Sequence, residues 1–312
     1  MRMRLILLLN MGGPNDLSEV GVFLKNMFND PYILGIKSPI LRKFVAFMIT
    51  SSRLKTAQNN YRQIGGKSPI CELTARLCGK ISHFLDDDTA VAFAMNYTPP
   101  FAKDILAEFT EASEIVVFPL YPHHSFTTVS SSISDFEKAR AELNLKAKVK
   151  IIEPFFEDER YNEIIVDGIE KSARDLNTDE ITLVFSAHSL PQKMIDAGDI
   201  YEEHVKRHVQ ILTEILVKRG VKFKQILLAY QSKLGPVKWL EPSLNQALAE
   251  IKDKKALVYP ISFCIDNSET VFELSKEFRH IADELKFNFY DVVACPNDDD
   301  KFAKFIADRA KE

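Results

Sequence analysis

His188 is the residue whose surroundings point most directly to chemistry. Residues 181–185 read ITLVF, an apolar and β-branched run that is too short for a buried helix and predicts a strand buried on both faces. Small residues and Pro191 end this strand, so the imidazole is expected just past its carboxyl end. Ligands bind at that edge of open α/β sheets, where an imidazole acts as a base near neutral pH or as a metal ligand. The alternative is a histidine that only hydrogen-bonds a neighbouring loop.

Three glutamates offer acidic partners for this histidine. Glu269, Glu273 and Glu277 recur at every fourth position, a spacing that places them along one face of a helix. Like charges at this spacing repel one another, so a purely structural helix gains nothing from them. Buried beside a cleft, they would raise one another's pKa and pass protons or hold a hard cation. The alternative is a solvated acidic helix face.

The types of residue present narrow the chemistry of such a site. An imidazole combined with carboxylates suits a divalent first-row metal such as Fe(II), and it lacks the three-histidine or histidine–cysteine set of a catalytic zinc site. The sequence contains no GxSxG elbow, no P-loop and no GxGxxG. Its four cysteines have neither C-x-x-C nor iron–sulfur spacing. The residues therefore predict a cleft with one general base and an acidic ladder.

The pattern of apolar runs predicts the elements that position these residues. Short apolar runs alternate with longer stretches of helical spacing, which is typical of βα units and parallel sheets. Polar and aromatic residues follow nearly every expected strand, and because parallel strands end at one edge, these residues are expected to share a cleft. We predict an α/β fold of two similar doubly wound, Rossmann-like halves that meet near residue 145. The strand expected over residues 149–152 is assigned to the second half.

Composition excludes several classes of protein. With 312 residues, 46% hydrophobic and 27% charged, the chain has the length of two domains and the composition of a soluble globular protein. Its net charge of −4 gives no global attraction to nucleic acid. No segment approaches the ~20 apolar residues that span a bilayer. We therefore expect a cytoplasmic protein that binds no nucleic acid.

Six motifs, in order along the chain, resemble those of ferrochelatases, which insert Fe(II) into a porphyrin. The motifs are LLLNMGGP (7–14), YRQIGGKSPI (61–70), LYPHHSFTTVSSS (120–132), FSAHSLP with a following GDIY (185–191 and 198–201), QSKLGPVKWLEP (231–242) and the ladder that begins at Glu269. The resemblance implies two similar chelatase-like domains, residues 1–145 and 146–296, around a porphyrin cleft. It also implies that a C-terminal helix, residues 297–312, packs back on the first domain.

The resemblance assigns roles to single residues. His188 and Glu269 take the places of the catalytic pair, which is also the candidate metal-binding pair, and Glu273 and Glu277 those of a proton or metal relay. The positions expected to bind porphyrin are Asn10, Met11, Arg53, Ser68, Tyr97, Trp239 and Phe263. Asp266 flanks the key carboxylate. Two positions depart from the family pattern: Asn96 stands where many members carry a basic residue, and Asn267 where some carry a histidine.

The implied activity is that of a lyase in the last step of haem synthesis. Its substrates would be protoporphyrin IX and Fe(II), its product protohaem, and no tightly bound cofactor is expected. The cysteine-bearing extension that holds an iron–sulfur cluster in some members is absent before the end at Glu312, so no such cluster is expected. The alternatives are a coproporphyrin ferrochelatase, a chelatase that inserts cobalt or nickel, and a non-catalytic porphyrin carrier.

Residues 33–49 raise the question of membrane contact. Apolar side chains alternate there with Lys37, Arg42 and Lys43, as they do in an interfacial helix. In the resembled family this segment corresponds to an apolar lip where the porphyrin enters. Peripheral contact with the inner face of the cytoplasmic membrane is therefore expected. The alternative is an amphipathic helix packed on its own domain.

Overall fold

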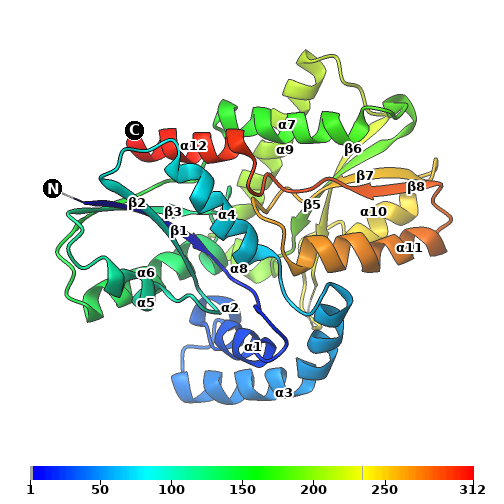
Figure 1. Ribbon diagram of the computed structural model, residues 1–312. Coiled ribbons are helices and arrows are strands. Elements are labelled where there is room, and N and C mark those ends of the chain that lie inside the picture. Colours follow the sequence, from blue (N-terminus) through cyan, green and yellow to red (C-terminus); the bar gives the residue numbers. More distant parts are fainter. Residues whose placement is uncertain (1–2, 234) are drawn as a thin grey trace. The chain divides into compact units, whose positions relative to one another are not determined.

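The computed structural model describes residues 3–233 and 235–312, and they form two compact units (Figure 1). The first unit contains the chain up to Tyr121, Ser125–Pro154 and Asp298–Glu312. The second contains Pro122–His124 and Phe155–Asn297. Each unit is built on a four-stranded parallel sheet with surrounding helices, which confirms the predicted α/β fold. Leu234 of the QSKLGPVKWLEP motif lies outside the described residues.

The sheet of the first unit has the strand order β2-β1-β3-β4. Strand β1 lies in its interior, and its residues Leu5 to Leu8 are fully buried because helices cover both faces of a parallel sheet. The predicted assignment of residues 149–152 to the second half is wrong: this strand pairs with β3, with Ile151 opposite Val117. The expected boundary near residue 145 therefore falls inside the first unit. The strands are β1 (Arg4–Asn10), β2 (Thr89–Met95), β3 (Glu114–Pro119) and β4 (Lys148–Ile151).

The first unit also includes the last helix of the chain. Helix α12 begins after Asp299, whose side chain caps its amino end, and it buries Phe302 and Phe305. The Arg4 guanidinium donates to the carbonyl of Ala310 at 2.6 Å, which ties this helix to β1. The helices of the unit are α1 (Val20–Phe28), α2 (Pro31–Leu34), α3 (Pro39–Gln63), α4 (Ile70–Ser82), α5 (Ala102–Glu108), the π-helix η1 (Phe126–Ser130), α6 (Ser131–Glu142) and α12 (Asp300–Lys311).

The sheet of the second unit has the order β6-β5-β7-β8. Strand β5 is an interior strand, and Leu183, Val184 and Phe185 are fully buried, as their β-branched and aromatic run predicts. His188 is its last residue and lies opposite Gln231 of β6. The strands are β5 (Thr182–His188), β6 (Gln225–Gln231), β7 (Lys255–Tyr259) and β8 (Phe289–Val292).

The glutamate ladder lies on a π-helix, η3 (Glu269–Glu277), and not on the regular α-helix assumed from its spacing. The Ser275 hydroxyl donates to the carbonyl of Thr270, five residues earlier, as a wide π turn allows. Apolar spacing alone does not separate a π-helix from an α-helix. The other helices of this unit are α7 (Glu159–Ala173), the 3₁₀ helix η2 (Thr178–Glu180), α8 (Gln192–Asp196), α9 (Tyr201–Lys218), α10 (Leu244–Glu250) and α11 (Phe278–Glu284).

Candidate active site

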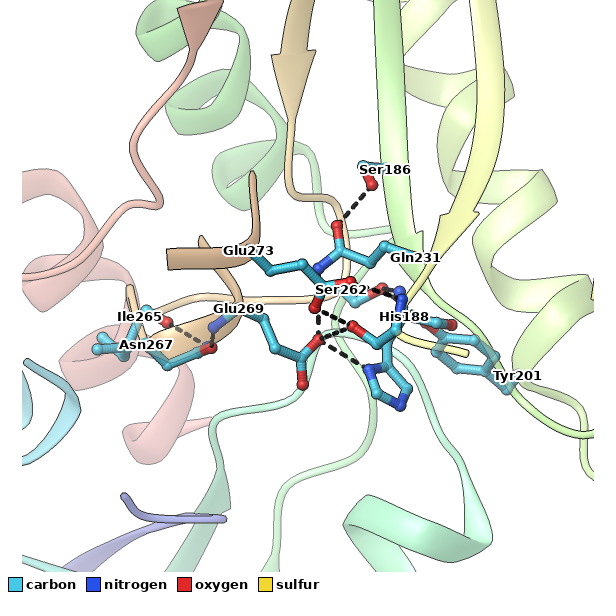
Figure 2. Close-up of polar contacts among 10 residues, drawn as sticks. Ser186, His188, Tyr201, Gln231, Ser262, Ile265, Asn267, Glu269 and Glu273 are labelled. Carbon is cyan, nitrogen blue, oxygen red and sulfur yellow. Dashed lines mark hydrogen bonds and ion pairs between the residues drawn. The ribbon is translucent and has the colours of Figure 1, made fainter. Parts of the chain in front are cut away.

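The backbone of His188 is held from two sides at the carboxyl end of β5 (Figure 2). Its N–H donates to the Ser262 hydroxyl at 3.1 Å, and its carbonyl accepts from the Tyr201 hydroxyl at 3.0 Å. The two hydroxyls lie 2.6 Å apart and are also hydrogen-bonded to each other. Both backbone groups are therefore hydrogen-bonded although the strand ends here. The backbone that carries the imidazole is thus held in place.

The His188 imidazole pairs with Glu269. Its Nδ1 lies 2.8 Å from Oε2 of the carboxylate, and the histidine side chain remains 37% exposed while the glutamate is 18% exposed. Because an ionised carboxylate only accepts, Nδ1 carries the proton and Nε2 of the neutral imidazole keeps its lone pair. The reactive nitrogen is thus the one that does not face Glu269.

The surroundings of this pair shift the pKa values of His188 and Glu269 in opposite directions. Burial lowers the pKa of His188, but the carboxylates of Glu269 and Glu273 outweigh it, so the pKa is raised above its usual value. Burial raises the pKa of Glu269, but His188 and hydrogen bonds from Ser232 and Gln231 outweigh it, so that pKa is lowered. A base that binds its proton more tightly therefore sits beside a carboxylate that stays ionised. Such a separation is typical of acid–base pairs in active sites.

Gln231 orients Glu269 from the neighbouring strand. The Ser186 hydroxyl donates to the Gln231 side-chain oxygen at 2.6 Å, which turns the amide nitrogen toward Glu269, 3.3 Å from Oε2 (Figure 2). Gln231 is the last residue of β6, and Ser186 is buried within β5. The neighbouring strands β5 and β6 thus fix both members of the pair.

Glu273 reaches the same cluster through Ser232. The Ser232 N–H donates to Oε1 of Glu273 at 2.8 Å, and its hydroxyl contacts Oε2 of both Glu273 and Glu269. Burial, followed by the charge of Glu269, raises the pKa of Glu273 to about 7. Glu277 lies at the exposed end of η3, and partial burial raises its pKa as well. The ladder therefore runs from a buried end at Glu269 to an exposed end at Glu277.

The loop before η3 is locked by side-chain amides. Asp266 and Asn297 form a reciprocal pair: the Asp266 N–H donates to Asn297 at 2.7 Å, and the Asn297 amide donates back to the carboxylate at 2.6 Å. Asn267, one of the two departures from the family pattern, accepts from the Glu269 N–H at 2.8 Å and donates its own N–H to Thr270 at 3.0 Å. Asn267 thus closes the first turn of η3 and sets the position of Glu269.

Trp239 lies in the loop after β6 and Phe263 in the loop after β7, and both residues are half-buried. The Trp239 indole donates to the carbonyl of Gly235 at 3.4 Å, and its backbone bridges to Pro191, just after His188. Phe263 is the residue directly after Ser262 in the chain. Their rings keep part of their surface free, as a role in binding a flat apolar ligand requires.

The porphyrin-contact candidates of the first unit lie in several environments. Asn10 and Met11 continue from β1, where the Asn10 side chain accepts from the Met11 N–H at 2.8 Å. The Tyr97 N–H donates to the carbonyl of Met11 at 3.0 Å, so these two loops lie together. Tyr97 is only 4% exposed, and its hydroxyl donates to Asp30 at 2.7 Å.

Two further candidates, Ser68 and Arg53, also lie in this unit. Ser68 is 3% exposed and lies directly beneath Gly13, where an added Cβ would come within 2.6 Å of the serine Cβ. Its N–H donates to the carbonyl of Pro14 at 2.8 Å. Arg53, in contrast, lies on the exposed side of α3. Their assignment to propionate contacts stays a prediction.

Sequence reasoning did not single out the residues that orient the pair: Ser232, Gln231, Tyr201 and Ser262. For Gln231, Ser232 and Ser262 the available signal was their place at or just after the ends of strands of one parallel sheet, at the same edge as His188. That position identifies a loop but does not reveal which side chains point toward the glutamates. Among residues 3–233 and 235–312, no three His, Cys, Asp and Glu side chains are grouped to hold a metal ion.

Comparison with known proteins is consistent over the full chain. A family model described as Ferrochelatase matches residues 5–312. A protein named Ferrochelatase from Campylobacter concisus is 61% identical over 306 residues, covering 98% of this chain and 96% of the relative. One from Campylobacter fetus is 52% identical and covers 99% of each chain, and one from Nitratiruptor is 50% identical and covers 98% of each.

Solved structures share the fold at much lower identity. CbiX, the terminal enzyme of siroheme biosynthesis in denitrifying bacteria, is 14% identical with a TM-score of 0.54, covering 99% of this chain and 98% of its own. SirB from Bacillus subtilis with Fe³⁺ is 12% identical with a TM-score of 0.55, covering 99% and 95%. These likenesses support a chelatase-like fold of two similar domains.

Proposed function

This chain belongs to the ferrochelatase family, as a lyase that inserts iron into a porphyrin in haem synthesis, and we propose that His188 and Glu269 are its catalytic pair. The observation that carries this proposal is the 2.8 Å bond between His188 Nδ1 and Glu269, which leaves Nε2 as a partly exposed base. Fe(II) and the porphyrin are both substrates. The same two residues are the candidates to hold the incoming metal.

Proton removal is the step that this pair is built to perform. Two pyrrole N–H protons must leave the macrocycle before iron can occupy its centre. Nε2 of His188 accepts one proton, because a base whose pKa is raised binds it more tightly. The imidazolium keeps its Nδ1 proton hydrogen-bonded to Glu269, whose lowered pKa keeps the carboxylate ionised, so that it stabilises the positive charge. Nε2 then releases the porphyrin proton to solvent, to which the His188 side chain is 37% exposed, so the imidazole is neutral again with its Nε2 lone pair free to accept the second pyrrole proton.

Glu273 and Glu277 are proposed to carry protons or metal along η3. Glu273 has a pKa of about 7, so it can take up and release a proton near neutral pH. Glu277, at the exposed end, exchanges with solvent. A graded path of this kind avoids leaving a charge buried beside the reacting ring.

The residues proposed to contact the porphyrin are both apolar and polar: Asn10, Met11, Arg53, Ser68, Tyr97, Trp239 and Phe263. The Asn10-Met11 loop resembles that of the branch that uses protoporphyrin, so we expect protoporphyrin IX as substrate and protohaem as product. Binding energy from these contacts can bend the macrocycle and expose its nitrogen lone pairs.

An anaerobic assay of the purified full chain tests this function. The protein is given Fe(II) with protoporphyrin IX or with coproporphyrin, and the haem product is followed by absorbance. We expect turnover with protoporphyrin to exceed turnover with coproporphyrin, and Co(II) or Ni(II) to compete as substrates. The reverse preference would assign the chain to the coproporphyrin branch. Binding of porphyrin without any metal insertion would identify a carrier and refute the proposal.

Helix α3 supports a second proposal, that this cytoplasmic protein contacts the inner face of the membrane peripherally. Its apolar side chains are strongly exposed, with Ile40 at 83%, Phe44 at 61% and Phe47 at 64%. Lys43 lies among them, as expected of an interfacial helix. No helix within the described ranges is both long and apolar enough to cross a bilayer.

Liposome sedimentation tests this proposal. Vesicles containing anionic lipid should pull down the wild-type protein, and the double variant Phe44→Ser/Phe47→Ser should lose most of this binding. Val217→Ser, which removes an apolar side chain that is 63% exposed on α9, is the matched control and should bind as wild type does. Equal binding by all three proteins would show that α3 does not contact the membrane.

A further inference from the structure

The last residue of β5 extends past the backbone of its neighbour β7. The paired register of the two strands ends with Phe185 opposite Tyr259. One more backbone bond follows, from the Ile261 N–H to the carbonyl of Ser186 at 3.0 Å. His188 lies two residues further along the strand, so its N–H and carbonyl face the same side as those of Ser186. On that side, two side-chain hydroxyls take the place of backbone partners.

Counting protons gives these hydroxyl contacts a single direction. The His188 N–H donates to the Ser262 oxygen at 3.1 Å, and the Tyr201 hydroxyl donates its one proton to the His188 carbonyl at 3.0 Å. The Ser262 hydroxyl therefore supplies the proton in the 2.6 Å contact between the two side chains. The bonds run from the His188 N–H through Ser262 and Tyr201 back to the His188 carbonyl, and Figure 2 shows the three residues together. Hydrogen bonds in such a chain strengthen one another.

The Tyr201 ring is itself held by packing within the second unit. It is 6% exposed, and the His123 imidazole meets it edge-on, with ring centroids 5.9 Å apart. The Asn162 amide donates to the carbonyl of Phe156 at 2.9 Å, so its oxygen accepts from Nε2 of His208 at 2.7 Å. Nδ1 of His208 then accepts from Nε2 of His123 at 2.8 Å. The tyrosine hydroxyl is thus fixed by contacts that do not involve His188.

We propose that Tyr201 and Ser262 are positioning residues, which fix the backbone of His188 and so direct its Nε2 for proton removal. This inference rests on the proposed function, in which Nε2 accepts the pyrrole protons. The two hydroxyls hold the backbone from which the side chain starts, and the 2.8 Å bond from Nδ1 to Glu269 sets how the imidazole is turned. Both hydroxyls bond to the backbone of His188, so they act through the histidine and not on the substrate. A displacement of about 1 Å at a reacting group can cost about 100-fold in rate.

Steady-state kinetics of Tyr201→Phe and Ser262→Ala test this role. Each variant removes one hydroxyl, and phenylalanine keeps the ring that packs on His123. We expect kcat for Fe(II) insertion to fall by between about 10-fold and about 100-fold. KM for both substrates should stay within about twofold of wild type, because neither residue is among the proposed substrate contacts. Ser262→Thr keeps the hydroxyl and should recover kcat to within about threefold of wild type.

Two controls separate positioning from a general loss of structure. Tyr259→Phe removes a buried hydroxyl from β7 that has no hydrogen-bond partner among the residues that the structure describes, and its kcat should stay within about twofold of wild type. Thermal unfolding of the same samples should give Tm values for Tyr201→Phe and Ser262→Ala within about 5 °C of wild type, since each loses the contacts of one hydroxyl.

A double-mutant cycle tests whether the two hydroxyls act together. Because they form one chain of bonds, the double variant Tyr201→Phe/Ser262→Ala should lie within about threefold of the slower single variant. Losses that multiply, a fall in kcat that Ser262→Thr does not recover, or single variants within about twofold of wild type would each overturn the positioning role. A wild-type protein that inserts no iron would instead refute the proposed function, so the two failures are distinguishable.

Discussion

Replacing Glu273 with glutamine should stabilise the protein in alkaline solution and not in acidic solution. Burial and the charge of Glu269 raise the pKa of Glu273 from 4.5 to about 7. Between these values the folded protein holds a proton that the unfolded chain has released, so wild-type stability falls as the pH rises. The displacement corresponds to at most about 3 kcal/mol. Glutamine carries no charge and escapes this loss.

Thermal unfolding measured from pH 5 to pH 8 checks this expectation. An effect of the substitution that does not depend on pH adds the same offset at every pH, so it cancels when the difference between variant and wild type at pH 8 is compared with the difference at pH 5. The Tm of the variant should rise relative to wild type by about 4–5 °C across this range, given the unfolding entropy of a chain of 312 residues. Glu250→Gln, which alters an exposed glutamate at the end of α10, should give a curve parallel to wild type. A parallel curve for Glu273→Gln would refute the reasoning about its buried charge.

Two further predictions follow from the site and from the close packing near it. Glu269→Gln should collapse kcat, because we propose that Glu269 acts in the chemical step, whereas Glu277→Gln should chiefly raise KM for Fe(II); equal losses in both would mean that the ladder acts as one unit. Gly12→Ala should lower the free energy of unfolding, measured by urea titration, by about 1–3 kcal/mol. The reason is that φ is 84° and a Cβ would lie 2.5 Å from Thr98 Oγ1. Gly79→Ala, with open space around it in α4, should raise stability by about 0.5–1 kcal/mol, and a rise for both glycines would contradict the steric argument.

The buried strand that carries His188 was predictable because its sequence signal is local. Residues 181–185 are apolar and β-branched, and only an interior strand buries such a run on both faces. The polar residue that ends it could then be placed at the carboxyl edge of the sheet. The six motifs identified the family from sequence, and the family model over residues 5–312 confirms it.

Strand β4 and helix η3 show where local signals fail. The sequence of residues 148–151 predicts a strand but does not say which sheet it joins, and that choice depends on packing against β3. The glutamate spacing predicts a helix face, but α and π turns bury similar apolar side chains. The choice between them depends on whether a backbone N–H bonds to the carbonyl four or five residues earlier, which the spacing of side chains does not specify.

The two departures from the family pattern also needed the structure to be understood. Asn96 donates to the Ser131 hydroxyl at 2.7 Å, where a basic residue would have brought a charge. Asn267 closes the first turn of η3 by accepting from the Glu269 N–H. Both asparagines have internal hydrogen-bond partners, and these partners are distant in sequence or depend on a turn that the sequence does not specify.

The central claim is that Nε2 of His188 removes porphyrin protons, and His188→Ala tests it most directly. The variant and wild type are compared anaerobically in a single-turnover assay of Fe(II) insertion, and porphyrin binding is titrated by fluorescence on the same samples. We predict a loss of insertion of at least about 100-fold, with porphyrin affinity within about threefold of wild type, because the apolar and propionate contacts that we propose for the porphyrin do not include His188. Retained insertion, or affinity lost in parallel with insertion, would contradict the account.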